Sequence, residues 1–328
     1  MKILVTGAAG FVGRAVVRAA AEHDVVAGVR KTHAVGWLAA TGATRHAVEL
    51  GLGALSGPRN TKLQGAMHDV DAVIHCAGRV RWGTRAEYER DNVRATEEAL
   101  DAAARAGVKR FVHVGSTAVY GDRAVELGPV TEDNPLGHCV SRLDRYSNTK
   151  IEAEERVLAA MSGPMEVVSV RPGWILGAGD ANLAPLAARL GGPVFPLLGR
   201  GDNRLPVTSV ASVARALLLA ATTPGIGGRV YNVAQDERIT QRELLEIVGE
   251  AAGVTPRLLP VPYEALYAGG LLGELLARAV PGNPPVVNRS AVILLGRDAD
   301  FPDTRIRSEL GWTPAAPIRD VIRSALGR

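Results

Sequence analysis

The chain has 328 residues and a formal net charge of +4, with 47% hydrophobic and 22% charged residues, which is typical of a globular protein with a sizeable core. No basic run contains interleaved aromatic residues, so nucleic-acid binding is disfavoured, and two cysteines exclude a disulfide framework and favour the reducing cytoplasm. We expect no signal peptide and no membrane span, because no apolar stretch is long enough for either.

The first predicted element is an apolar strand over 2–6 that leads into the glycine turn Gly7-Ala8-Ala9-Gly10-Phe11-Val12-Gly13. Apolar residues then recur at helical spacing and predict a helix over 11–22. A strand, a glycine turn and a helix in this order can place a pyrophosphate on the helix N-terminus. Gly7 would let the turn form, Gly10 would let the backbone approach phosphate, and Gly13 would let the helix approach the strand. Because the spacing is G-x-x-G-x-x-G, an ordinary strand–helix turn is the alternative.

Strand-like and helix-like segments alternate through the first half of the chain. We predict strands at 24–29, 71–76, 110–114 and 166–170 and helices at 92–106 and 143–161. This alternation predicts an α/β fold with a Rossmann-type, doubly wound parallel sheet. Past Gly177 the alternation is lost and glycine and proline become dense, which predicts a smaller, mostly C-terminal substrate lobe. We assign 1–175 and about 207–234 to the dinucleotide-binding domain, and 176–206 and about 235–328 to the substrate lobe.

Two charged residues, Arg30 and Lys31, follow the strand at 24–29. A carboxylate at this place would accept the ribose hydroxyls of NAD, whereas a guanidinium pairs with a 2′-phosphate. The sequence therefore favours NADP(H) as the cofactor. NAD(H) is the alternative if Arg30 only stacks on adenine.

Tyr146 and Lys150 lie four residues apart in the helix predicted at 143–161, so their side chains share one face. A neighbouring ammonium group favours the phenolate of a tyrosine, whose ordinary pKa is about 10. We expect Lys150, together with an oxidised nicotinamide ring, to lower the pKa of Tyr146. The phenol would then act as an acid or base toward a carbonyl or alcohol oxygen. A surface Tyr/Lys pair is the alternative.

Ser116 follows the predicted strand at 110–114, at the end where open α/β sheets bind ligands. Its hydroxyl is placed to donate to a substrate oxygen and to hold that oxygen against Tyr146. Thr117 is a competing candidate for the same role. A serine that only forms a turn is the alternative.

In this order, the segments resemble the extended short-chain dehydrogenase/reductase family over nearly the whole chain. Besides the glycine turn and the Tyr146/Lys150 pair, the matching segments are 71–78, 92–96, 114–121, 171–173, 228–233 and 309–314. The resemblance implies that Ser116, Tyr146 and Lys150 form a catalytic set, with Lys150 also bound to the nicotinamide ribose. It implies a cofactor site that includes Gly7, Gly10, Phe11, Val12, Gly13, Arg30, Lys31, Glu49, Leu50, Ala77, Gly78, Asn92, Tyr146, Lys150, Pro172, Gly173 and Ile175. For Asn92, the implied role is at least partly structural.

The chain departs from the family pattern at two places. The segment 209–214 lacks the acidic residues that the family often has there, which leaves the contacts of that helix open. Trp174 is bulky where many sugar-nucleotide enzymes of the family have a smaller or polar residue, so the substrate side of the pocket would be narrower or lined differently.

The second lobe is apolar and resembles the 3β-hydroxysteroid dehydrogenase and ketone-reductase branch more than the sugar-nucleotide branch. We therefore predict an oxidoreductase that interconverts a bulky, largely apolar ketone and its secondary alcohol. The small-molecule pocket is expected to include Trp82, Thr117, His138, Cys139, Trp174 and Arg204. We expect no metal ion at the site.

Two other classes of function stay open at this point. One is a nucleotide-sugar epimerase or dehydratase that retains NAD(P), and the other is a non-enzymatic NADP-binding redox sensor. The presence of Ser116, Tyr146 and Lys150 together weighs against the sensor. The resemblance also implies a homodimer through the helices at 92–106 and 143–161.

Overall fold

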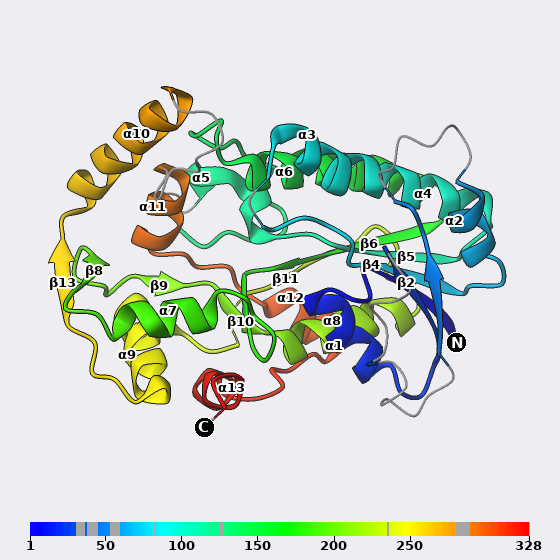
Figure 1. The fold of residues 1–328 in the computed structure, drawn as a ribbon. Helices are drawn as coiled ribbons and strands as arrows, with labels where there is room; N and C mark the ends of the chain where they lie inside the picture. The colour runs from blue at the N-terminus through cyan, green and yellow to red at the C-terminus, as the bar shows by residue number, and fades with distance from the viewer. Residues whose placement is uncertain are drawn as a thin grey trace.

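Seven parallel strands form the central sheet of the computed structural model, which describes residues 1–30, 37, 45–52, 60–81, 83–124, 128–234, 236–279 and 289–327 (Figure 1). The strand order is β11–β6–β5–β4–β1–β2–β3. The strands are β1 (Lys2–Thr6), β2 (Asp24–Val29), β3 (Arg45–Glu49), β4 (Ala72–His75), β5 (Arg110–Val114), β6 (Glu166–Pro172) and β11 (Val230–Val233). The order reverses between β1 and β4, and ligands of doubly wound sheets bind at such a switch point.

Helices cover both faces of the sheet, and each face has its own apolar cluster. On one face lie α1 (Phe11–Ala19), α8 (Val210–Thr222) and α12 (Thr304–Leu310). On the other face lie α2 (Thr61–Ala66), α4 (Ala95–Arg105) and α6 (Arg145–Ala160). The alternation of strand residues matches these layers, because Ile3 and Val5 join the first cluster and Leu4 joins the second. The predicted fold class is confirmed.

Short helices lead into the main ones at the edge of the sheet where the strands end. They are α3 (Arg85–Tyr88), a π-helical turn (Glu89–Arg94), a 3-10 helix (Thr117–Tyr120) and α5 (Gly121–Ala124). The helix predicted at 92–106 is thus continuous with a π-helical turn that begins three residues earlier. The helix predicted at 11–22 is shorter, since α1 ends at Ala19.

The second lobe is built from two-stranded sheets and helices around a third apolar cluster. The strand pairs are β7 (Trp174–Leu176) with β10 (Val207–Ser209), β8 (Phe195–Leu198) with β13 (Leu258–Val261), and β9 (Arg204–Leu205) with β12 (Ile239–Thr240). The helices are α7 (Leu183–Leu190), α9 (Gln241–Ala252), α10 (Tyr263–Ala279), α11 (Arg289–Gly296) and α13 (Ile318–Ala325). Figure 1 places α7 and α9 beside the small strands, away from β2 and β3.

One late segment of the chain returns to the first lobe. Ile306 and Leu310 of α12, and Trp312 just after it, are buried in the same cluster as α1 and β1. The indole Nε1 of Trp312 donates a hydrogen bond to the carbonyl oxygen of Ser212 over 3.0 Å. These contacts tie residues that we expected in the substrate lobe to α8 of the sheet domain.

The missing acids of segment 209–214 are replaced by one carboxylate from another part of the chain. Asp236 accepts hydrogen bonds from the Thr208 hydroxyl over 2.6 Å and from the Ser209 backbone N–H over 2.8 Å. Its second oxygen also accepts from the Ser212 hydroxyl. The start of α8 therefore keeps a carboxylate contact, supplied by a residue that lies beyond β11.

Candidate active site

The glycine turn connects β1 to α1 with very little space between helix and strand. Gly7 has a φ of +63°, and a Cβ there would lie 2.8 Å from the backbone of Ala77 after β4. A Cβ on Gly13 would overlap the carbonyl oxygen of Gly7, so α1 lies directly against the turn. Only glycine satisfies both positions.

Gly10 occupies the N-cap position of α1 and is exposed. It has no side chain to bond the first N–H groups of the helix, and these groups have no acceptor within the helix. A Cβ on Gly10 would approach only the Gly7 carbonyl oxygen, at 3.1 Å. The uncapped N-terminus and the open space over Gly10 fit the pyrophosphate of a dinucleotide.

Arg30 follows β2 directly, and its side chain is 73% exposed. One guanidinium nitrogen lies 3.4 Å from the Asp91 carboxylate, which also accepts from Arg79 Nε over 2.9 Å and from Arg90 Nε over 2.7 Å. These hydrogen bonds hold the pKa of Asp91 below its usual value, although burial opposes them. Arg79 also pairs with Glu87 over 3.3 Å, so three arginines and two carboxylates leave a net positive charge beside the end of β2. Lys31 lies outside the described residues.

The other predicted cofactor residues lie around this turn and the ends of neighbouring strands. Leu50 is buried against Gly28 of β2, and the Glu49 carboxylate lies 3.7 Å from Lys62. The hydroxyl of Thr6 accepts a hydrogen bond from the Ala77 N–H over 3.2 Å, and Gly78 is exposed. Phe11 and Val12 begin α1. Pro172 ends β6, Gly173 connects it to β7, and Ile175 lies within β7.

Asn92 has a structural role in this arrangement. Its Oδ1 accepts from the Arg79 backbone N–H over 2.6 Å, and its Nδ2 donates to the Thr149 hydroxyl over 3.0 Å. The side chain therefore links the loop after β4 to α6, one residue before Lys150.

Ser116 and Tyr146 meet at the end of β5. Ser116 caps the 3-10 helix through its Oγ, which accepts from the Ala118 N–H over 3.2 Å. Tyr146 is the second residue of α6, and its phenol lies close enough to the Ser116 hydroxyl for that hydroxyl to lower its pKa. Burial raises the pKa of Tyr146 above its ordinary value, and the Ser116 hydroxyl only partly opposes the shift. We expected Lys150 and an oxidised nicotinamide ring to lower the pKa of Tyr146, whereas the protein chain by itself raises it.

The position of Lys150 explains this difference. Its Nζ donates to the carbonyl oxygen of Val114 over 2.7 Å and lies 3.5 Å from His113 Nε2, so the ammonium is directed at β5. Burial lowers the pKa of Lys150 to about 8, and the charge of Glu154 opposes this shift. Lys150 does not contribute to the shift of Tyr146, whose pKa is set by burial, Ser116 and the charge of Asp144.

A buried polar network continues from Lys150 beneath the site. Glu154, one turn further along α6, accepts from the Ser169 hydroxyl over 2.7 Å and from Arg171 Nε over 2.8 Å. Its other carboxylate oxygen lies 3.7 Å from His113 Nε2. The sequence reasoning missed Glu154, although its spacing of four residues from Lys150 places it on the same helix face.

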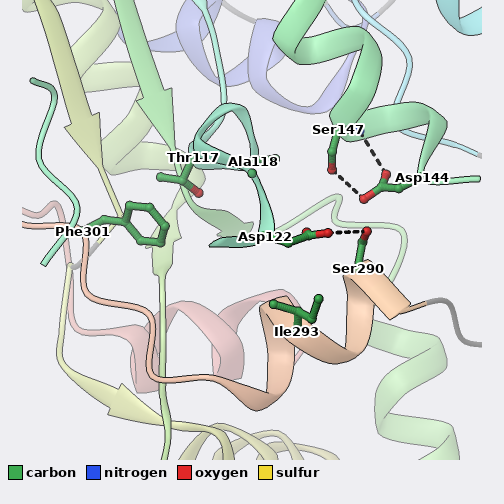
Figure 2. Close-up of a pocket in the computed structure, with 9 residues that line it drawn as sticks. Thr117, Ala118, Asp122, Asp144, Ser147, Ser290, Ile293 and Phe301 are labelled. Carbon is green, nitrogen blue, oxygen red and sulfur yellow. Dashed lines mark hydrogen bonds between the residues drawn. The ribbon is translucent and has the colours of Figure 1, made fainter. Parts of the chain in front are cut away.

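A pocket lies beside the 3-10 helix that Ser116 caps and the start of α6, which holds Tyr146. Its lining comes from these elements, from α5 and from residues 290–301 (Figure 2). The lining consists of Thr117, Ala118, Gly121, Asp122, Asp144, Ser147, Ser290, Ile293 and Phe301. Thr117 is the one predicted pocket residue among them. Asp122 and Ser290 are joined by a hydrogen bond of 3.0 Å although 168 positions separate them, so no local pattern could have paired them.

Trp82 is outside the described residues, and the other predicted pocket residues are not among this lining. His138 is exposed, with its backbone against Gly121. Cys139 packs beside the Tyr120 cluster, close enough to Asp144, Asp122 and Ser147 of the lining for them to act on the pKa of its thiol. Trp174 packs in the core of the second lobe. Arg204 forms ion pairs with Asp298 over 2.5 Å and with Asp300 over 3.4 Å, and these carboxylates neutralise it.

Within the part of the chain that the structure describes, no helix meets the length and apolarity needed to cross a bilayer.

Comparison with known proteins gives three informative similarities. A curated relative from Stigmatella aurantiaca, 4-hydroxy-2-methyl-3-oxo-4-farnesyl-3,4-dihydroquinoline-1-oxide ketoreductase, is 34% identical over 95% of this chain and 92% of its own. The 2-alkyl-3-oxoalkanoate reductase of Stenotrophomonas maltophilia is 30% identical over 98% of both chains. A short-chain dehydrogenase/reductase superfamily structure from Agrobacterium tumefaciens with bound NAD has a TM-score of 0.72 and 25% identity, covering 99% of this chain and 96% of that one.

The reductase relatives and the dinucleotide fold make this protein an NAD(P)-dependent enzyme of the short-chain dehydrogenase/reductase type. The model of the NAD dependent epimerase/dehydratase family matches residues 3–234, which include the glycine turn, Ser116, Tyr146 and Lys150. The chain belongs to this family.

Proposed function

We propose that the protein reduces a bulky, largely apolar ketone to its secondary alcohol with NADP(H). The observation that carries this proposal is the approach of the Tyr146 phenol to the Ser116 hydroxyl at the end of β5, beside a pocket lined by both polar and apolar side chains. Two relatives that cover nearly the whole chain are named as reductases of ketones, which supports the same reaction class.

The proposed roles follow from the positions of the side chains. Ser116 and Tyr146 donate hydrogen bonds to the ketone oxygen, and Tyr146 passes its proton to that oxygen as negative charge develops. Because the pKa of Tyr146 is raised, the group is a neutral phenol at neutral pH and can donate, which suits the direction of reduction. Lys150, charged below its pKa of about 8, holds positive charge beneath the reacting groups. A bound nicotinamide cofactor supplies the hydride.

The cofactor would lie over the glycine turn, with its pyrophosphate at Gly10 and the start of α1. We propose that Arg30 contacts the 2′-phosphate of NADP(H), because the cluster around Asp91 holds more arginines than carboxylates. Glu49, Leu50, Ala77 and Gly78 would contact the adenine side. Pro172, Gly173 and Ile175 would border the nicotinamide.

Three further features of the enzyme stay predictions. We propose a homodimer through α4 and α6, which lie together on one face of the sheet. The cytoplasmic location is supported by Cys76 and Cys139, both of which are free thiols. The division into a dinucleotide-binding domain and a substrate lobe is likewise part of the proposal.

The proposed function predicts a specific failure of Tyr146→Phe. The variant loses the proton donor, so kcat for ketone reduction should fall at least about 100-fold. Binding of NADPH, followed by its fluorescence, should stay within about twofold, and the wild type should show a lower KM for NADPH than for NADH. Tyr263→Phe, which keeps the ring that Arg297 stacks on, serves as the control. Wild-type turnover by Tyr146→Phe would contradict the assignment, and preference for NADH would contradict the choice of cofactor.

A nucleotide-sugar epimerase or dehydratase is the second candidate, because the matching family model covers such enzymes. An enzyme of that kind returns the hydride to its substrate. It would purify with its cofactor bound and convert a nucleotide sugar without net consumption of NADPH. Assays of NADPH oxidation on bulky ketones and on nucleotide sugars separate the two functions.

A further inference from the structure

Two carboxylates line the pocket beside Ser116 and Tyr146 (Figure 2). Asp122 is 9% exposed, and its Oδ2 accepts from the Val140 N–H over 2.6 Å and from the Ser290 hydroxyl over 3.0 Å. Asp144 accepts from the N–H and the hydroxyl of Ser147 over 3.0 and 2.7 Å, so it also caps α6. Neither hydrogen-bonding partner is a cation, so no hydrogen-bonded positive side chain neutralises either acid, and burial raises the pKa of both.

No lysine or arginine occurs among the lining residues in the described part of the chain. Arg289 precedes the lining residue Ser290, but two of its guanidinium nitrogens lie 2.9 and 3.2 Å from the Glu274 carboxylate. Burial raises the pKa of Asp144, and the negative charges of Asp122 and Glu274 raise it further. Negative charge is thus crowded on the wall next to the proposed proton donor.

We propose that this pocket selects uncharged ketones and rejects ketones that carry a carboxylate or phosphate near the carbonyl carbon. The inference rests on the proposed function, since it takes the ketone oxygen to be held by Ser116 and Tyr146. Thr117 and Ser147 directly follow these two residues, so the groups next to the carbonyl reach the wall that contains Asp122 and Asp144. An anionic substituent there meets like charge at low solvent exposure and is repelled.

The other wall of the pocket supports an uncharged substrate. Ile293 of α11 and Phe301 are apolar and almost fully buried, at 5% and 1% exposure. They carry no charge that could balance an anion. The pocket therefore differs from a site for a nucleoside diphosphate sugar or a free oxo acid, which needs cationic side chains.

The test compares a 2-alkyl-3-oxoalkanoate with its methyl ester as substrates of the full-length enzyme and NADPH. The two ketones differ by one charge two carbons from the carbonyl. We expect kcat/KM for the ester to exceed that for the acid at least about tenfold, or about 1.4 kcal/mol. Equal values, or preference for the acid, would overturn the inference and leave ketone reduction standing. No reduction of either ketone would contradict the proposed function, and this inference with it.

Two variants locate the cause of the selection. Asp122→Asn and Asp144→Asn remove the negative charge and keep one acceptor oxygen each, so each should raise kcat/KM for the acid and narrow the ratio of ester to acid. Asp101→Asn, on the exposed side of α4, is the matched control and should leave the ratio unchanged. A ratio that stays constant in both folded variants would overturn the role of the carboxylates.

Discussion

Lys150 lies among polar side chains that are almost entirely removed from water. Its ammonium faces His113 and the Val114 carbonyl. Interactions with Glu154 and Cys76 raise the pKa of Lys150, and the charge of Lys150 acts in turn on His75. Burial and the charge of Lys150 lower the pKa of His75 to about 3, so this ring is neutral at physiological pH. Glu154 is thus the group that favours the charged form of Lys150 most strongly. We regard Glu154 as a positioning residue, since it acts through Lys150.

Glu154→Gln should shift the pH dependence of the reaction. Removing the negative charge lowers the pKa of Lys150 below about 8, so the ammonium loses its proton at lower pH. The alkaline limb of the profile of kcat/KM should move to lower pH, with little change in KM for the ketone near pH 6. The profile is measured by NADPH oxidation between pH 6 and about 10.

Glu152→Gln is the control for this prediction, because Glu152 lies on the same helix but pairs with Arg85 at the surface. Its profile should match the wild type. An alkaline limb that does not move in folded Glu154→Gln would show that Glu154 has only a structural role, through Ser169 and Arg171.

Single residues near one another in sequence were the easiest to predict. Tyr146 and Lys150 are separated by one helical turn, and the three glycines by three positions each, so local geometry was enough. Asp91 was missed because Arg30 and Arg79 reach it from the ends of two different strands. The orientation of Lys150 toward β5 was also beyond the sequence, since it depends on the packing of α6 against the sheet.

At the scale of elements, the strands of the sheet follow from apolar runs that are buried on both faces. The boundaries of helices depended on capping residues. Thr84 and Glu87 form a capping box at the start of α3, and the T-x-x-E spacing was a signal for this helix that we did not use. The π-helical turn that follows has no comparable sequence signal, and so the start of the helix predicted at 92–106 was placed too late.

Gly13→Ala tests the close approach of α1 to the glycine turn. The new Cβ would overlap the Gly7 carbonyl oxygen and lie 2.8 Å from the Ala8 Cα, both of which are backbone atoms. Moving the helix should cost about 1–3 kcal/mol of unfolding free energy and weaken NADPH binding at least about tenfold. Thermal melting and fluorescence titration measure the two effects.

Gly65→Ala is the matched control, because a Cβ at this position in α2 meets no atom within 4 Å. Alanine also favours a helix by about 1 kcal/mol, so this variant should be as stable as the wild type or more so. Wild-type NADPH affinity in Gly13→Ala would contradict the proposed place of the pyrophosphate.

At the scale of the whole molecule, the chain crosses between its lobes more than once. The loss of strand–helix alternation and the dense glycine and proline after Gly177 predict the second lobe. The segment at 207–234 is expected to rejoin the sheet. No change in composition marks the second return of the chain to the sheet, through α12 and Trp312. This return depends on the burial of apolar side chains against α1 and α8, which only the folded chain brings together.

Trp312→Phe should destabilise the sheet domain although the residue lies close to the C-terminal end. The indole is 1% exposed, and its loss leaves the Ser212 carbonyl without this donor and a small cavity in the core. We expect the unfolding free energy in urea to fall by about 1–3 kcal/mol. Arg323→Ala removes only an exposed ion pair with Glu250 and should cost at most about 1 kcal/mol. Equal effects of the two substitutions would show that the tryptophan contact contributes little.

The walls of the pocket have different origins, and this allows substrate range and chemistry to diverge separately. Ser290, Ile293 and Phe301 belong to the second lobe, whereas Ser116, Tyr146 and Lys150 belong to the sheet domain. Substitutions in α11 can therefore reshape the cavity while the residues of the proposed proton donor and cofactor site stay unchanged. Descendants of one ancestral reductase could acquire new ketones by mutation of this single short helix, without passing through an inactive intermediate.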